Sequence, residues 1–116
     1  MSRSILQPGW QPIEELYIEV EQFLVERGAN PDEMAIVRNP AGYYIVSRRP
    51  TIVMPPGGPD TILELAAHYG ASYFILEPEG VLEEYQEVYD QVEVNPKLKY
   101  LGDVEGARIF ELHPAK

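Results

Sequence analysis

The chain has 116 residues, a formal net charge of −10, 45% hydrophobic residues and no cysteine. This length suits one domain with one ordinary core. A chain without cysteine has no disulfide and no thiolate-ligated metal, and the acidic charge disfavours nucleic acid as a partner.

No apolar run of the sequence is long enough to cross a membrane, and the first residues lack the apolar stretch of a signal peptide. We therefore expect this chain to be soluble, and either cytoplasmic or a piece of a longer protein. Residues 1–11 show no hydrophobic period and are predicted to form a flexible tail, which leaves a single domain at 12–116.

The first predicted helix begins at Pro12, which suits the first helical position, and stops at Gly28. Between them, apolar residues recur at helical spacing: Ile13, Leu16, Tyr17, Val20, Phe23 and Leu24. A continuously apolar run at 34–37 then predicts a buried strand, which Pro40 and Gly42 interrupt. Residues 43–47 fit either a strand or one helical turn. A second buried strand is predicted at 51–54, followed by a loop of three prolines and two glycines at 55–59.

A second helix is predicted from Asp60 or Thr61 to the stop at Gly70, with Thr61 and Glu64 matching a capping box. A third strand follows at 72–76. The segment 81–92 predicts a third helix with an apolar face formed by Val81, Leu82, Tyr85, Val88, Tyr89 and Val92. Two strands at 97–101 and 107–112, joined by a turn at 103–106, predict a closing hairpin.

This order predicts an α/β fold, Rossmann-like, with a mostly parallel sheet, flanking helices and a C-terminal antiparallel hairpin. Ligands of open α/β sheets bind beyond the carboxyl ends of the strands. The residues that follow the predicted strands and carry polar or aromatic groups are the candidate ligand-binding set: Arg38, Asn39, Tyr43, Tyr44 and Glu77.

Arg38, Arg48 and Arg49 form a cationic island in an acidic chain. They suit an anionic ligand, a phospholipid head group or an acidic partner surface. The alternative is that Arg48 and Arg49 are solvated and that Arg38 pairs with a local acid. The glycine loop at 55–59 suits a plain turn better than a phosphate site, because its prolines remove donors and Asp60 adds a negative charge.

His68 and His113 lie far apart, and His68 suits the end of a helix, where the dipole favours a cation. No catalytic arrangement, no metal site and no cofactor motif is predicted from the residues.

Several short strings of the sequence carry a resemblance to a known class of domain. They are 31–33 (Pro-Asp-Glu), Arg38-Asn39-Pro40 with Tyr43-Tyr44, 49–53, 73–77, 100–102 and 107–112. The chain resembles the soluble C-terminal domain of bacterial membrane glycosyltransferases that use polyprenyl-phosphate sugars, the protein mannosyltransferase and aminoarabinose transferase class.

The resemblance implies a non-catalytic accessory domain on the extracytoplasmic face of a bacterial membrane. In that family an acidic residue of the membrane portion carries the reaction, so no catalytic residue transfers to this chain. The implied partners are the membrane portion of the parent protein and a lipid-linked sugar donor or an acceptor that the domain helps to place. The alternative is a stand-alone α/β module that binds a small molecule or a protein near Arg38.

Overall fold

The computed structural model describes residues 12–79 and 81–112. Its helices are α1 (Pro12–Glu26), α2 (Pro40–Ser47), α3 (Pro59–Tyr69), the 3₁₀ turn η1 (Glu83–Tyr85) and α4 (Gln86–Asp90). Its strands are β1 (Met34–Val37), β2 (Thr51–Val53), β3 (Ala71–Leu76), β4 (Leu98–Val104) and β5 (Ala107–Leu112). The tail predicted at 1–11 lies outside the described residues. None of the described helices is long and apolar enough to span a membrane.

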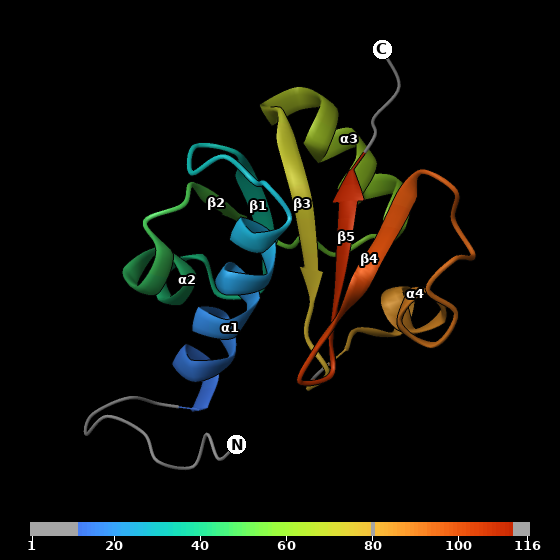
Figure 1. The fold of residues 1–116 in the computed structure, drawn as a ribbon. Helices are drawn as coiled ribbons and strands as arrows, with labels where there is room; N and C mark the ends of the chain where they lie inside the picture. Colours follow the sequence, from blue (N-terminus) through green and yellow to red (C-terminus); the bar gives the residue numbers. More distant parts are fainter. Residues whose placement is uncertain (1–11, 80, 113–116) are drawn as a thin grey trace.

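The strands form one five-stranded sheet in the order β2-β1-β3-β5-β4 (Figure 1). β1 pairs in parallel with both β2 and β3. β5 runs antiparallel to β3, and β4 runs antiparallel to β5. The predicted α/β class, the parallel first part and the C-terminal hairpin are confirmed, and the sheet as a whole is mixed.

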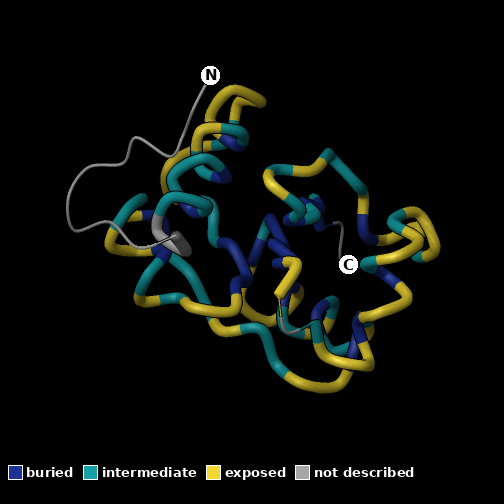
Figure 2. Tube along the Cα trace, turned by 90° about the horizontal axis from the view of Figure 1, so that it is seen from below, coloured by how far each residue is buried: buried dark blue, intermediate teal, exposed yellow. Residues whose placement is uncertain are grey.

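Helices cover both faces of the sheet, and alternate strand residues supply a core on each side. On one face Tyr17, Val20 and Leu24 of α1 and Tyr43 of α2 pack on Ala35, Val37, Ile75 and Ile109. On the other face α3 and the η1–α4 segment pack on Ile36, Phe74, Leu76 and Phe110. The buried stretches lie in the middle of the molecule and the exposed ones at its rim (Figure 2).

Two crossover connections run on opposite faces of the sheet. α2 links β1 to β2 on the face that α1 covers, and α3 links β2 to β3 on the other face. The chain leaves β1 toward α2 on one face and leaves β3 toward the η1–α4 segment on the other, so the segments that follow the carboxyl ends of β1 and β3 diverge. Such a divergence is where open α/β sheets form their binding crevice.

Residues 43–47, which fitted either a strand or a helical turn, belong to α2. The Asn39 side chain caps this helix by accepting a hydrogen bond from the Gly42 amide at 3.1 Å, and Pro40 occupies the first turn. Arg48 ends the helix in the left-handed region with φ 62°.

The predicted start of α3 is wrong. The helix begins at Pro59 with Gly58 as its N-cap, so neither Asp60 nor Thr61 caps it and the capping box with Glu64 does not form. Gly58 has φ 88° and ψ −172°, a backbone conformation essentially restricted to glycine. Pro59 then supplies a φ suited to the first helical position, so the helix starts earlier than the side-chain caps indicated.

The continuous third helix predicted at 81–92 is also wrong. Leu82 is extended, a 3₁₀ turn occupies Glu83–Tyr85, and α4 ends at Asp90. Two tertiary hydrogen bonds hold the start of this segment. The Tyr85 hydroxyl donates to the carbonyl of Pro55, and the amide of Gly57 donates to Oε2 of Glu84 at 3.2 Å. These contacts override the helical periodicity of the sequence.

Candidate functional site

The carboxyl ends of β1 and β3 bring two charged residues of the candidate set together. Arg38 directly follows β1, and Glu77 directly follows β3. Glu77 is only 7% exposed. The charge of Arg38 and a hydrogen bond from its main chain both stabilise the charged form of the Glu77 carboxylate. The structure therefore places a cation beside a buried carboxylate where the segments that follow β1 and β3 diverge.

The environment of Glu77 favours its neutral form. Burial raises the pKa of Glu77 above its ordinary value, while the Tyr17 hydrogen bond and the nearby Arg38 act in the opposite direction. The hydroxyl of Tyr17 donates to Oε2 of Glu77, so one carboxylate oxygen is committed to α1. This site combines the Glu77 carboxyl group, a hydrogen-bond acceptor with a raised pKa, with the exposed guanidinium of Arg38.

Tyr17 is part of the site although the sequence indicated it only as a core residue. Its hydroxyl accepts a hydrogen bond from the Asn39 amide at 3.3 Å while donating to Glu77. Burial and the neighbouring carboxylate raise the pKa of Tyr17, which keeps the phenol protonated. Tyr17 and Glu77 lie 60 positions apart in the chain, so no local sequence pattern predicts their contact.

The other candidate residues lie at different places. Arg38 is exposed, and its Nη1 donates to the carbonyl of Glu79. Asn39 is committed to capping α2. Tyr43 is buried and its hydroxyl donates to Oε1 of Glu21 at 2.9 Å, away from Glu77. Tyr44 is exposed on α2. The structure thus brings Arg38, Asn39 and Glu77 together around Tyr17. The Tyr43 ring packs on the Tyr17 ring, with the centroids 4.9 Å apart, but its hydroxyl is directed to Glu21.

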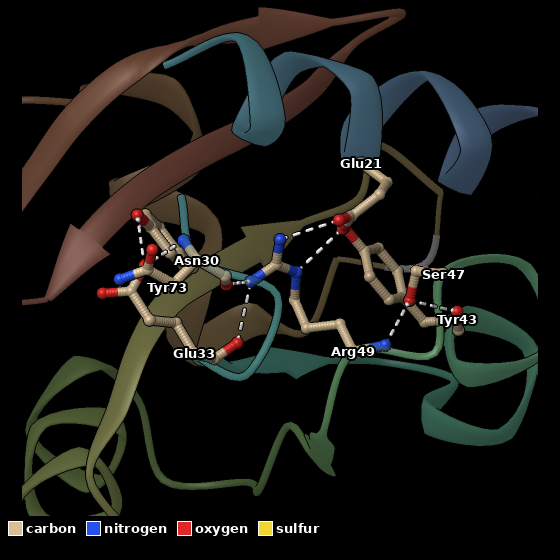
Figure 3. Close-up of polar contacts among 7 residues, drawn as sticks. All are labelled: Glu21, Asn30, Glu33, Tyr43, Ser47, Arg49 and Tyr73. Carbon is tan, nitrogen blue, oxygen red and sulfur yellow. Dashed lines mark hydrogen bonds and ion pairs between the residues drawn. The ribbon is translucent and has the colours of Figure 1, made fainter. Parts of the chain in front are cut away.

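Arg49 occupies a buried polar centre on the same face of the sheet (Figure 3). Its Nε and Nη2 bind the two carboxylate oxygens of Glu21 at 2.8 and 2.7 Å. Its Nη1 donates to the carbonyls of Asn30 and Glu33 at 2.7 and 2.9 Å. The hypothesis that Arg49 is solvated is wrong, because a partner 28 positions away neutralises it inside the fold.

This centre shows a structural role for Arg49. The bidentate pair with Glu21 fastens α1, and the two carbonyl contacts fasten the loop that enters β1. The bonds to Glu21 outweigh burial and raise the pKa of Arg49 above its ordinary value, so it remains charged. Of the three arginines in the predicted island, Arg38 and Arg48 are the two that are exposed.

The glycine loop is bound by a carboxylate of the same chain, the exposed Glu84. Glu84 accepts the hydrogen bond of the Gly57 amide near the start of α3, where a bound anion would otherwise meet the helix. Burial raises the pKa of Tyr85 to about 12, and its hydroxyl holds the same loop through Pro55. His68 lies exposed in the last turn of α3, as its sequence position indicated. His113 lies outside the described residues.

The titration of Glu77 provides a test of this geometry. Its pKa is raised in the folded chain, so the folded state holds the proton more tightly than the unfolded state. Stability therefore falls as the pH rises from the unfolded pKa through the folded pKa. Glu77→Gln removes the charge and retains an acceptor for Tyr17. We expect E77Q to be more stable than the wild type at neutral pH.

Chemical denaturation of both proteins across this pH range measures the effect. The advantage of E77Q should vanish below the ordinary glutamate pKa of about 4.3. Glu64→Gln, which alters an exposed glutamate of α3, is the control and should show no such trend. An E77Q protein that is less stable than the wild type at neutral pH would contradict the assigned environment.

Within the described ranges 12–79 and 81–112, no three acidic or histidine side chains are grouped to hold a metal ion. Comparison with known proteins adds no assignment: no family model matches the sequence, and neither a curated protein nor a solved structure matches the chain.

Proposed function

We propose that this chain is a non-catalytic accessory domain that places a ligand carrying both an anionic group and hydroxyl groups. The proposal follows the resemblance to the extracytoplasmic domains of membrane glycosyltransferases. A lipid-linked sugar phosphate has both kinds of group, and the membrane portion of a parent protein would carry out the transfer.

One observation carries the proposal: Arg38 and Glu77 meet at the carboxyl ends of β1 and β3. A guanidinium binds phosphate oxygens through directed N–H groups, and a carboxylate accepts hydrogen bonds from sugar hydroxyls. Burial makes Glu77 easier to protonate, which weakens its repulsion of an approaching anion. The pair therefore suits a phosphorylated sugar better than either a simple anion or a neutral sugar.

The strand order supports a finer description of the fold as Rossmann-like. The first three strands lie in the order β2-β1-β3 with crossovers on opposite faces, as in doubly wound sheets. In this description the antiparallel β4–β5 hairpin replaces the later parallel strands.

Binding of mannose 1-phosphate, measured by calorimetry and by amide shifts in nuclear magnetic resonance spectra, tests the proposal. We expect saturable binding with shifts at Arg38 and Glu77, and weaker binding of inorganic phosphate or free mannose. Arg38→Ala should weaken binding about tenfold or more, because a hydrogen bond to a charged group contributes about 1.5–3 kcal/mol.

The control is Arg48→Asn, which removes a cation of the same island from the opposite end of α2. It should leave sugar phosphate binding unchanged. Equal losses in both variants would indicate general charge attraction and would contradict a site at the carboxyl edge. Sugar transfer by the isolated chain, supplied with a lipid-linked donor and a peptide acceptor, would disprove the non-catalytic role.

A stand-alone binding module is the second candidate, and the exposed position of Arg38 at the carboxyl end of β1 supports it equally. The two candidates differ in the ligand. Tight binding of a phosphorylated metabolite in the absence of any lipid-linked sugar affinity would favour the stand-alone module.

A further inference from the structure

The surface formed by the exposed residues Tyr44, Ile45, Arg48 and Val53, here named the α2–β2 surface, lies at one edge of the sheet. α2 lies beside β2 (Figure 1), and the Thr51 hydroxyl donates to the carbonyl of Pro40 at 3.1 Å across the two elements. Ile45 is 62% exposed and Val53 is 56% exposed. Large apolar side chains are thus concentrated here on two neighbouring elements.

The outer side of β2 has main-chain groups that β1 does not use. The Ala35 amide donates to the carbonyl of Pro50, and the Met54 amide donates to the carbonyl of Val37. In a parallel pair, alternate residues of a strand bond the neighbouring strand, so the main-chain groups of residue 52 point toward β1. The amides and carbonyls of Thr51 and Val53 point away from β1. β2 is the last strand on its side of the sheet, so these groups form an open edge.

Charge distinguishes this edge from the rest of the chain. Residues 34–54 contain three arginines and no acidic residue, in a protein with a net charge of −10. Arg49 is neutralised by Glu21, and the Arg38 guanidinium binds the carbonyl of Glu79 beyond β3, on the side of β1 away from β2. Arg48, which lies shortly before β2, is therefore the exposed cation at this edge.

The opposite edge of the sheet is protected against pairing. β4 contains Lys99 and a register shift between Tyr100 and Gly102. Charged side chains and bulges are devices by which proteins prevent an edge strand from accepting another chain. The three residues of β2 contain neither device.

We propose that the α2–β2 surface binds an extended acidic segment of a partner protein, which adds a strand beside β2. Main-chain hydrogen bonds to Thr51 and Val53 would set its position, and its apolar side chains would cover the exposed ones of the surface. Aspartate or glutamate at the end of the segment that lies beside Arg48 complements its charge. This surface is separate from the sugar phosphate site, and the proposal does not depend on that site.

The probe is the peptide Asp-Asp-Val-Thr-Val-Thr-Asp-Asp. It is compared with the same peptide carrying lysine in place of its four aspartates. Binding to the whole chain is followed by amide shifts and hydrogen exchange in nuclear magnetic resonance spectra. We expect the acidic peptide to bind, to protect the Thr51 and Val53 amides, and to bind less tightly as salt is added. The lysine peptide should not bind.

Arg48→Asn tests the electrostatic part without straining the backbone, because asparagine tolerates the left-handed conformation of this position. It should weaken acidic-peptide binding by up to about fivefold, the effect of one exposed ion pair. Arg27→Gln is the matched control, because it removes an exposed charge at the far end of α1. Ile45→Ser should weaken binding, whereas Val94→Ser, an exposed valine after α4, should not.

Four results would overturn the proposal. They are absence of acidic-peptide binding, equal binding of the lysine peptide, binding without protection at Thr51 and Val53, and equal effects of R48N and R27Q. Two further results would assign the surface to another occupant and overturn it as well. One is binding to phosphatidylglycerol vesicles without peptide binding. The other is a concentration-dependent dimer by light scattering that R48N abolishes.

Discussion

Replacing Arg49 with alanine is expected to lower the free energy of unfolding by about 3–5 kcal/mol, the usual cost of breaking a buried ion pair from one side. The variant leaves the Glu21 carboxylate, which is 17% exposed, without its bidentate partner. It also removes Nη1 of Arg49, which donates hydrogen bonds to the carbonyls of Asn30 and Glu33. Urea denaturation followed by circular dichroism measures the loss.

Arg49→Lys should recover only part of this stability, because an ammonium cannot form the forked contact with Glu21 and reach both carbonyls at once. The neighbouring Arg48→Asn, which alters an exposed arginine, is the matched control and should stay within about 0.5 kcal/mol of the wild type. Combining Arg49→Met with Glu21→Leu should be less harmful than Arg49→Ala alone. A loss below about 1 kcal/mol in R49A would contradict the structural role assigned here.

Replacing Phe74 with alanine is expected to cost about 3–5 kcal/mol of stability through the cavity that it leaves. Phe74 is fully buried on β3, and its ring lies 5.8 Å from the rings of both Tyr85 and Phe110. Its loss therefore weakens the contact of the sheet with the η1–α4 segment and with β5. The same denaturation measurement applies.

Phe74 lies on the face of the sheet opposite α1, so the fraction of F74A that remains folded should bind mannose 1-phosphate like the wild type. Val53→Ala provides the stability control, because Val53 is exposed and its truncation should change stability by about 0.5 kcal/mol or less. A nearly neutral F74A would mean that this face of the core is not packed as described.

Local patterns in the sequence predicted most of the fold. The periodicity around Tyr17 and Val20 predicted α1, and the apolar runs at 34–37 and 72–76 predicted β1 and most of β3. In these elements the buried residues recur at a fixed local spacing in the sequence, so a local pattern is enough to predict them. The predicted third helix failed because Tyr85 and Glu84 bind the glycine loop, contacts that local periodicity does not contain.

The candidate site was predictable only in part for the same reason. Arg38 and Glu77 follow apolar strands, and the rule about strand carboxyl ends identified both positions. Tyr17 and the Arg49–Glu21 pair were missed, because their partners lie 60 and 28 positions away. An arginine between Arg48 and Pro50 has no local sign of burial. Only the docking of α1 on the sheet makes Arg49 an interior residue.

That docking has a consequence for the order in which the domain matures during synthesis. α1 is synthesised before the strands β3 and β5, whose residues receive part of its apolar face. Tyr17 has no Glu77 to bind until β3 has been made, and Val20 and Leu24 have no complete sheet to cover until the C-terminal hairpin has been made. The core on this face of the sheet can therefore be completed only after β5 has been synthesised, when α1 packs on strands that lie far from it in the sequence.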